Sequence, residues 1–92
     1  MNENEMLKLH KYICEELRKK RISLEKRQDE VAFDLNITAS FLSRIETGKK
    51  PNSSFITYLV LCDYYGTNLD TIIRKARRKK RIDEQEEEGE DF

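Results

Sequence analysis

The stretch QDEVAFDLNITASFLSRIETGKKP, residues 28–51, contains two short amphipathic segments that are separated by only a few residues. In the first segment, Val31, Ala32 and Leu35 recur at helical spacing, and polar side chains occupy the other side. This pattern predicts a helix of about two turns that buries one face.

The second segment predicts a helix over 39–46. Thr38 precedes it and offers a hydroxyl that can accept a hydrogen bond from an unpaired amide of the first turn. Leu42 and Ile45 would be buried, and Gly48 would end the helix because glycine adopts positive φ without a side-chain penalty. Helices this short must pack against other helices to be stable. A tight joint between two of them is the geometry that presents the second helix to the DNA major groove.

The longer segment RQDEVAFDLNITASFLSRIETGKKPNSSFITYLVLCDYYGTNLDTII resembles the Cro-like helix-turn-helix family of prokaryotic repressors, often called the Xre family. SRIETG at 43–48 is similar to the family's SRIENG, and GTNLD at 66–70 is similar to its GVSLDEL. Further matches are Gln28, Val31, Ala32, Leu35 and Ile37. The resemblance covers roughly residues 13–73. It implies a sequence-specific double-stranded DNA-binding transcriptional regulator, a repressor that binds an inverted repeat as a homodimer, of prokaryotic, phage or mobile-element origin.

The rest of the chain carries no strand signal, so we expect an all-α fold of five helices. The first helix would run over 4–20, which starts earlier than in the family's minimal form. The fourth would run over 55–65 after a Ser54 cap, and the fifth would begin at Leu69 after an Asn68 cap.

The predicted fourth helix is apolar on both sides. Its inward set would be Phe55, Leu59 and Cys62, with Tyr58 and Leu61 alongside. Ile56, Val60 and Tyr64 recur at i, i+4 and i+8, where an outer face should be polar. Either the start of the first helix, through Met6 and Leu9, or a second copy of the chain would cover them. Because the resemblance implies a two-fold dimer, we expect Ile56, Val60 and Tyr64 at a dimer interface.

The resemblance also implies which residues of the second predicted helix meet base edges: Ala39, Ser40 and Arg44. The Arg44 guanidinium can bond O6 and N7 of guanine together, which is worth about 1 to 3 kcal/mol of discrimination. A phosphate contact or a solvated arginine is the alternative. Ala39 and Ser40 are short, so base readout by hydrogen bonds is sparse and DNA shape contributes more.

Contacts to the DNA backbone are expected from residues around both predicted helices. These are Lys26, Arg27, Gln28, Phe41, Ser43, Thr47, Lys49 and Lys50. Gln28 would bond a phosphate at a helix N-terminus, or else cap its own helix. Phe41 would press on the sugar-phosphate wall, or else pack against a neighbouring side chain. Over 18–50 the chain has nine Lys and Arg against five Asp and Glu, so positive charge is available there.

The resemblance pairs Arg21 with Glu46 as a partly buried ion pair that orients the recognition helix. One departure from the family concerns the turn before this motif. The family usually has Gly-Leu where this chain reads Glu25-Lys26-Arg27, so the turn lacks its glycine. Phe33 is a second departure, and we expect the extended first helix to cover it.

We divide the chain into an extension of the first helix over 1–12, a DNA-binding domain over 13–73 and a tail over 74–92. Charged residues are distributed unevenly along it. Lys and Arg number 18, and Asp and Glu also number 18. Seven positive charges fall in 74–82 and seven negative ones in 83–92. We expect a partly disordered tail. Three functions stay open for it: DNA phosphate contact, folding back to weaken nonspecific binding, and binding of a protein partner.

The sequence lacks a phosphate-binding glycine loop, a metal-ligand cluster and a nucleophile with a neighbouring histidine. We therefore expect neither an enzyme nor a cofactor or metal. Cys14 and Cys62 are expected as reduced core thiols, with a disulfide as the alternative, and His10 as a solvated residue. The longest apolar run, 58–62, is far too short to span a bilayer, so we expect a soluble cytoplasmic protein.

A second function stays open beside DNA-binding regulation. The short recognition side chains and the spare apolar face of the predicted fourth helix also suit an antitoxin-like or co-regulatory module. Such a module would act mainly through protein contact.

Overall fold

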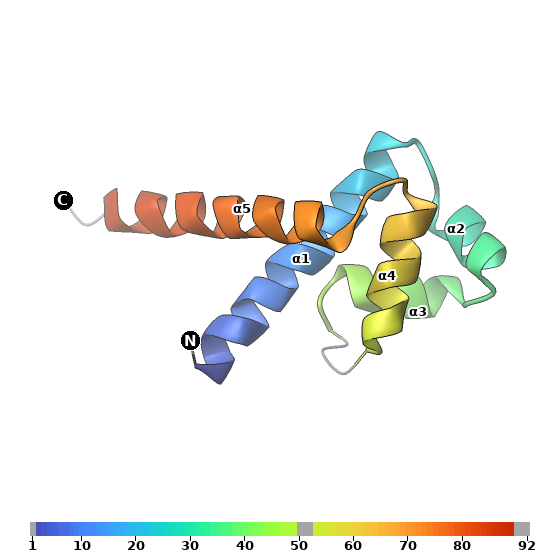
Figure 1. The fold of residues 1–92 in the computed structure, drawn as a ribbon, viewed down its shortest axis with the longest axis horizontal. Helices are drawn as coiled ribbons and strands as arrows, with labels where there is room; N and C mark the ends of the chain where they lie inside the picture. The colour runs from blue at the N-terminus through green and yellow to red at the C-terminus, as the bar shows by residue number, and fades with distance from the viewer. Residues whose placement is uncertain (1, 50–52, 90–92) are drawn as a thin grey trace.

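The computed structural model describes residues 2–49 and 53–89, and this part of the chain contains five α-helices and no strand. The helices are α1 (Glu3–Ser23), α2 (Gln28–Leu35), α3 (Ala39–Glu46), α4 (Phe55–Tyr64) and α5 (Leu69–Gly89). The expected all-α, five-helix fold is therefore confirmed (Figure 1). Lys50, one of the expected phosphate contacts, lies outside the described residues.

Local signals in the sequence begin and end most of these helices. The side chains that cap helix starts are Asn2, Thr38, Ser54 and Asn68. At α3 the Thr38 hydroxyl accepts from the Phe41 amide at 3.0 Å, which satisfies one unpaired donor of the first turn. Asn36, at the end of α2, has φ +57°, and Gly48, just after α3, has φ +72°. Both residue types tolerate this left-handed conformation.

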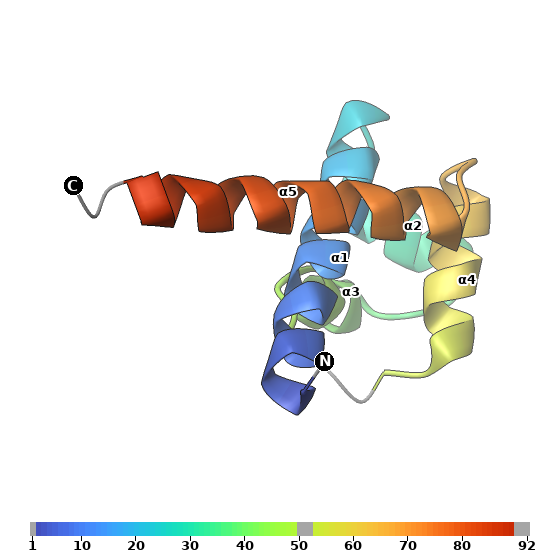
Figure 2. The ribbon, with the colours of Figure 1, turned by 60° about the vertical axis from the view of Figure 1, so that its left-hand side comes forward.

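The core forms where all five helices contribute buried apolar side chains. Its fully buried members are Cys14, Leu17, Val31, Leu42, Ile45, Leu61 and Ile72. The helix α1 contacts both α3 and α5, while α2 and α3 pack closely on each other. In two views α5 crosses α1, and its C-terminal part extends away from α2, α3 and α4 (Figures 1 and 2).

The tail differs from the expected disorder, because α5 continues as one helix through the basic run and into the acidic run to Gly89. Two pairs at i, i+4 span the charge boundary, Lys79 with Asp83 at 3.1 Å and Lys80 with Glu84 at 2.7 Å. Such pairs stabilise a helix. The Tyr12 hydroxyl of α1 also donates to Asp83 at 2.8 Å, which fastens this part of α5 to α1.

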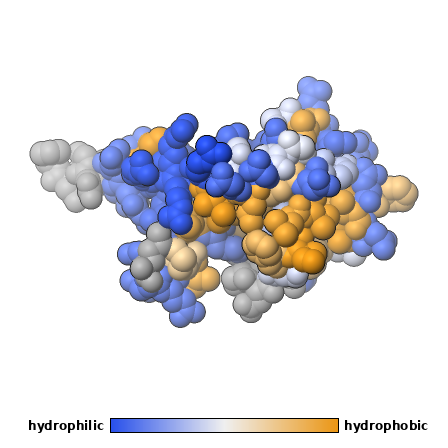
Figure 3. Space-filling model, in the orientation of Figure 1, coloured by the Kyte–Doolittle hydropathy of each residue, from blue (hydrophilic) through white to orange (hydrophobic). Residues whose placement is uncertain are grey.

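The apolar surface of α4 is larger than the sequence predicts. Buried against the core are Tyr58, Leu61 and Cys62. The expected inward positions of Phe55 and Leu59 are wrong, because they join Ile56 and Val60 on the outside, all between 42 % and 65 % exposed. We call these four residues the α4 apolar face. They lie in the large hydrophobic area over α4 (Figure 3).

The first helix leaves this face open. Leu9 is buried, but it lines a pocket with residues of α5 rather than covering α4, and Met6 is 40 % exposed. Phe33 is 86 % exposed, so the expected cover from the extended first helix is absent among the described residues. Tyr64 is half-buried, and its hydroxyl donates to the Asp34 carboxylate.

His10 is not the solvated residue that the sequence suggests. Its Nε2 lies 2.7 Å from the Tyr58 hydroxyl oxygen and 3.5 Å from Cys14 Sγ, which links α1 to α4. Burial lowers the pKa of His10 below its usual 6.5. Cys14 and Cys62 are buried and free, as expected, and burial raises the pKa of the Cys14 thiol to about 11. These thiols are protonated and unreactive at neutral pH.

Candidate nucleic-acid interface

The outer surface of α3 consists of short side chains and one arginine. Ala39, Ser40 and Arg44 are exposed, whereas Leu42 and Ile45 on the opposite side are completely buried. The structure therefore brings together the three residues for which we expected base contacts, on the solvent side of one helix. Side chains three and four residues apart share a helix face, so Ser40 and Arg44 lie one turn apart.

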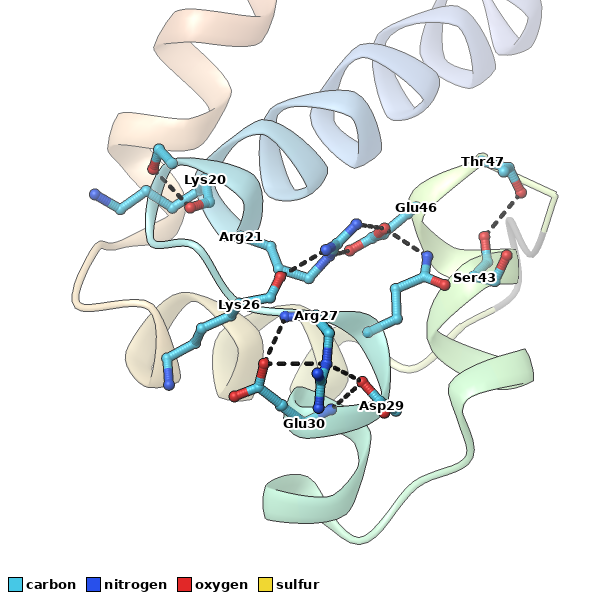
Figure 4. A network of polar contacts seen from close by, with 11 residues as sticks. Lys20, Arg21, Lys26, Arg27, Asp29, Glu30, Ser43, Glu46 and Thr47 are labelled. Carbon is cyan, nitrogen blue, oxygen red and sulfur yellow. Dashed lines mark hydrogen bonds and ion pairs between the residues drawn. The ribbon is translucent and has the colours of Figure 1, made fainter.

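A buried carboxylate holds the C-terminal end of α3. Glu46, which is 2 % exposed, accepts from Arg21 Nε at 2.7 Å through Oε2 and from Arg21 Nη2 at 3.0 Å through Oε1. Arg21 Nη1 donates to the carbonyl of Lys26 at 2.7 Å, in the turn before α2 (Figure 4). This ion pair is the one that the family resemblance implies. The hydrogen bonds that Arg21 donates to Glu46 raise the pKa of Arg21, so the guanidinium stays charged.

Gln28 adds a third element to this arrangement. Its Nε2 donates to Glu46 Oε1 at 2.9 Å, so α1, α2 and α3 meet at one carboxylate. We call Arg21, Gln28 and Glu46 the Glu46 cluster. The Gln28 side chain is half-buried and is engaged inside the protein. A phosphate contact from Gln28 must therefore use the second N–H of its side-chain amide or its backbone amide.

One buried hydroxyl near this cluster, that of Tyr65, lacks a hydrogen-bond partner in the part of the chain that the structure describes. Tyr65 is 3 % exposed. Burial raises the pKa of Tyr65, and the Glu46 carboxylate raises it further. A neutral phenol therefore stays next to the ion pair.

Lys26 and Arg27, the residues in the glycine-free turn, are both engaged locally. Arg27 Nε lies 3.1 Å from Asp29 Oδ1, on the exposed N-terminus of α2. Lys26 Nζ lies 5.3 Å from the centroid of the Tyr64 ring, within the range of a cation–π contact. The exposed pair of Arg27 with Asp29 is weak, so Arg27 can exchange it for a phosphate at little cost.

The remaining expected backbone contacts lie around the C-terminal half of α3. The Thr47 hydroxyl donates to the carbonyl of Ser43 at 3.0 Å, and Lys49 is exposed. Phe41 is half-buried and packs against the core, so its position fits the packing alternative better than a DNA contact.

Two cations that are not among the individually predicted DNA contacts lie beside this end of α3. Arg18 of α1 lines a shallow pocket together with Thr47, and Lys11 packs against Gly48, where a Cβ would lie 3.3 Å from Lys11 Cγ. Lys11 and Arg18 are seven residues apart, so they share one face of α1. That spacing is the signal that could have assigned them to the same surface.

A protein-family model described as "Helix-turn-helix domain" matches residues 14–72, which span the Glu46 cluster, α3 and the first turn of α5. Among curated proteins, none matches this chain. Within the described residues no helix is long and apolar enough to cross a membrane, and no group of three acidic, His or Cys side chains could hold a metal ion.

Proposed function

Because the chain belongs to the helix-turn-helix domain family, we propose that it is a sequence-specific double-stranded DNA-binding regulator of the Cro-like branch. It acts as a repressor in a prokaryotic cytoplasm and binds an inverted repeat as a homodimer. A protein that covers a promoter hinders transcription directly, so repression is the simpler mode of regulation.

The observation that carries this proposal is the exposed face of α3 held by the Glu46 cluster. Arg44 lies on that face in the last turn of the helix, and Ser40 lies one turn before it. The carboxylate at Glu46 is fixed by donors from α1 and α2, so the orientation of α3 is set before DNA binds. Preorganisation of this kind reduces the ordering cost of binding.

One group of residues reads the bases, and another positions the protein on the DNA phosphates. Arg44 supplies base discrimination through guanine, and Ala39 and Ser40 supply short contacts to base edges. Positioning on the phosphates comes from Lys49 and from the N-terminus of α2, with Lys11 and Arg18 added from α1. Each phosphate contact makes affinity fall with added salt through counterion release.

Dimerisation is the part of the proposal that the α4 apolar face supports. Phe55, Ile56, Leu59 and Val60 form a contiguous exposed surface on one helix, whereas Tyr64 is engaged with Asp34 and contributes less than expected. Two copies related by a two-fold axis would bury this face and set their α3 helices in successive major grooves.

Selection of binding sites from a random pool of duplex DNA tests the proposal. The expected result is enrichment of an inverted repeat with half-sites centred about 10 to 10.5 base pairs apart. Failure of the wild-type protein to enrich any sequence over input would contradict it.

The same α4 apolar face favours a second candidate, a co-regulatory or antitoxin-like module that acts through a protein partner. Phe33, exposed on α2, adds a further apolar contact point. A module of this kind would show no sequence enrichment in the selection experiment. It would act by binding a protein partner through the α4 apolar face or the tail.

A further inference from the structure

A small pocket lies between α5 and the N-terminal half of α1, beside the point at which these two helices cross (Figures 1 and 2). It is lined by Leu9 of α1 and by Arg77, Lys80, Arg81 and Glu84 of α5, and its volume is about 180 Å³. A cavity of about 150 Å³ in another protein holds benzene, so this pocket has room for one small ring or a short aliphatic chain. No residue of α3 or α4 lines it, so it is separate from the candidate nucleic-acid interface and from the α4 apolar face.

The most buried residue of this pocket is apolar and lies outside the core. Leu9 is 6 % exposed, but it is not part of the cluster of buried side chains that the five helices share. Its neighbours in the pocket are long charged side chains of α5. The methylene stems of such side chains cover apolar surface while their charged groups reach solvent. An apolar molecule can therefore enter between these stems and pack on Leu9 without displacing a core contact.

The opening of the pocket carries more positive charge than its own carboxylate neutralises. Lys80 donates to Glu84 at 2.7 Å, and Lys8 lies 3.6 Å from the same carboxylate. Arg77 and Arg81 are four residues apart and share one face of α5. Both are exposed, and neither forms an ion pair in the part of the chain that the structure describes. Two guanidinium groups are thus free to bind an anion beside an apolar surface.

We propose that this pocket binds a small apolar monocarboxylate, an aromatic or aliphatic acid whose carboxylate is held by Arg77 and Arg81 and whose apolar body packs on Leu9. A guanidinium donates two parallel hydrogen bonds to a carboxylate, which a lysine ammonium does not. The apolar body adds the free energy of burying hydrocarbon surface. A bare anion such as acetate or phosphate satisfies the arginines but leaves Leu9 without this contact.

The bound acid would join α1 to α5. Polar contacts already link these parts of the two helices, because Tyr12 donates to Asp83 at 2.8 Å and Lys8 lies 3.6 Å from Glu84. A ligand that touches Leu9 and both arginines binds only when α5 lies on α1, so it stabilises that arrangement. At a ligand concentration ten times the Kd, opening of the contact between the two helices becomes about tenfold rarer. Hydrogen exchange of the α5 amides that depends on this opening should slow by the same factor.

A titration with four probes tests the chemistry of the site. The full chain, labelled with ¹⁵N and free of DNA, is titrated at constant ionic strength with benzoate, benzyl alcohol, acetate or inorganic phosphate. We expect benzoate to shift the amide signals over 77–84 and to bind with a Kd at least about tenfold lower than each of the other three probes. Benzyl alcohol lacks the charge, and acetate and phosphate lack the apolar body. Acetate or phosphate that binds as tightly as benzoate would overturn the proposal.

Two double variants test the residues. Arg77→Gln combined with Arg81→Gln should raise the Kd for benzoate about tenfold or more and should abolish the slowing of hydrogen exchange. Arg74→Gln combined with Arg78→Gln removes the same charge from exposed positions of α5 that do not line the pocket, and it should keep the wild-type Kd. All four positions are exposed, so both variants should stay folded.

Equal affinity of the two double variants for benzoate would overturn the proposal, and so would a wild-type protein whose signals over 77–84 benzoate does not shift. The site stands independently of the proposed DNA binding, because every measurement uses the protein without DNA.

Discussion

Gln28 Nε2 donates a hydrogen bond of 2.9 Å to Glu46 Oε1, and this bond joins the first residue of α2 to the last residue of α3. The same carboxylate receives two bonds from Arg21 of α1. The angle between the two helices of the motif therefore depends on one buried charge. A substitution at Glu46 should lower the stability of the fold directly and should affect DNA binding only through that loss.

Glu46→Gln should strongly destabilise the fold. The substitution removes the negative charge and leaves Arg21, which is 8 % exposed, without a counter-ion. Breaking a buried pair by removing one partner costs about 3 to 5 kcal/mol. Urea unfolding measures this loss, and Asp29→Asn, which removes an exposed carboxylate beside Arg27, is the matched control and should cost less than about 1 kcal/mol. Similar losses for both variants would contradict a special role for the Glu46 cluster.

Glu25→Gly should stabilise the protein. Glu25 has φ +57°, a left-handed conformation that costs an L-residue about 1 to 2 kcal/mol. Glycine removes that strain but adds freedom to the unfolded chain, so the net gain should be about 0.5 to 1 kcal/mol. Thermal unfolding checks the sign, with Lys20→Gly inside α1 as a control that should destabilise by about 1 kcal/mol. A lower melting temperature for Glu25→Gly would contradict this prediction and show that the Glu25 side chain itself stabilises the turn.

His10 should make the free energy of unfolding depend on pH below the usual His pKa of 6.5. Burial lowers its pKa in the folded state, so the unfolded chain binds a proton more readily. Stability is then complete above the usual value of 6.5 and declines as the pH falls toward the lowered pKa. Asp83 and Glu84 have lowered pKa values too, but their contributions are lost only below about pH 4.5.

Urea unfolding at several pH values measures this slope, and His10→Gln should flatten it just below pH 6.5. An unchanged slope in that variant would assign the effect to another group.

Ile56→Glu should keep the protein folded and prevent dimerisation through α4. Ile56 is 65 % exposed, so the monomer loses little on substitution, whereas a charge in a buried interface is costly. Sedimentation velocity at tens of micromolar measures dimerisation. Phe33→Ser removes an exposed apolar side chain elsewhere and should leave the dimer intact. A wild-type monomer under these conditions would contradict dimerisation through α4.

The helices of the motif could be predicted because their signals are local. The Thr38 hydroxyl caps the start of α3, and Gly48 follows its end in a left-handed conformation. Neither effect depends on residues far away in the sequence. The faces of α4 could not be predicted, because apolar residues lie on both sides and only packing against α1 and α5 decides which are buried. Phe55 and Leu59 were therefore assigned to the wrong side.

Long-range contacts explain the other differences. The acidic run has the composition of a disordered end, but Tyr12 lies 71 residues before Asp83 and still holds it in place. His10 likewise meets Tyr58 across 48 residues. In the candidate site, the exposed arginine of α3 could be inferred from helical spacing, whereas the engagement of Gln28 with Glu46 required the three-dimensional arrangement.

The discrimination between two DNA sequences tests the central claim most directly. Fluorescence anisotropy at one fixed salt concentration gives the affinity for DNA upstream of the protein's own gene and for unrelated DNA of equal length. The wild type should prefer the upstream DNA, Arg44→Ala should lose about 1 to 3 kcal/mol of that preference, and Arg74→Ala, an exposed arginine paired with Asp70 on α5, should retain it. Equal wild-type affinity for both DNAs, or an Arg44→Ala variant that keeps the full preference, would contradict readout by α3.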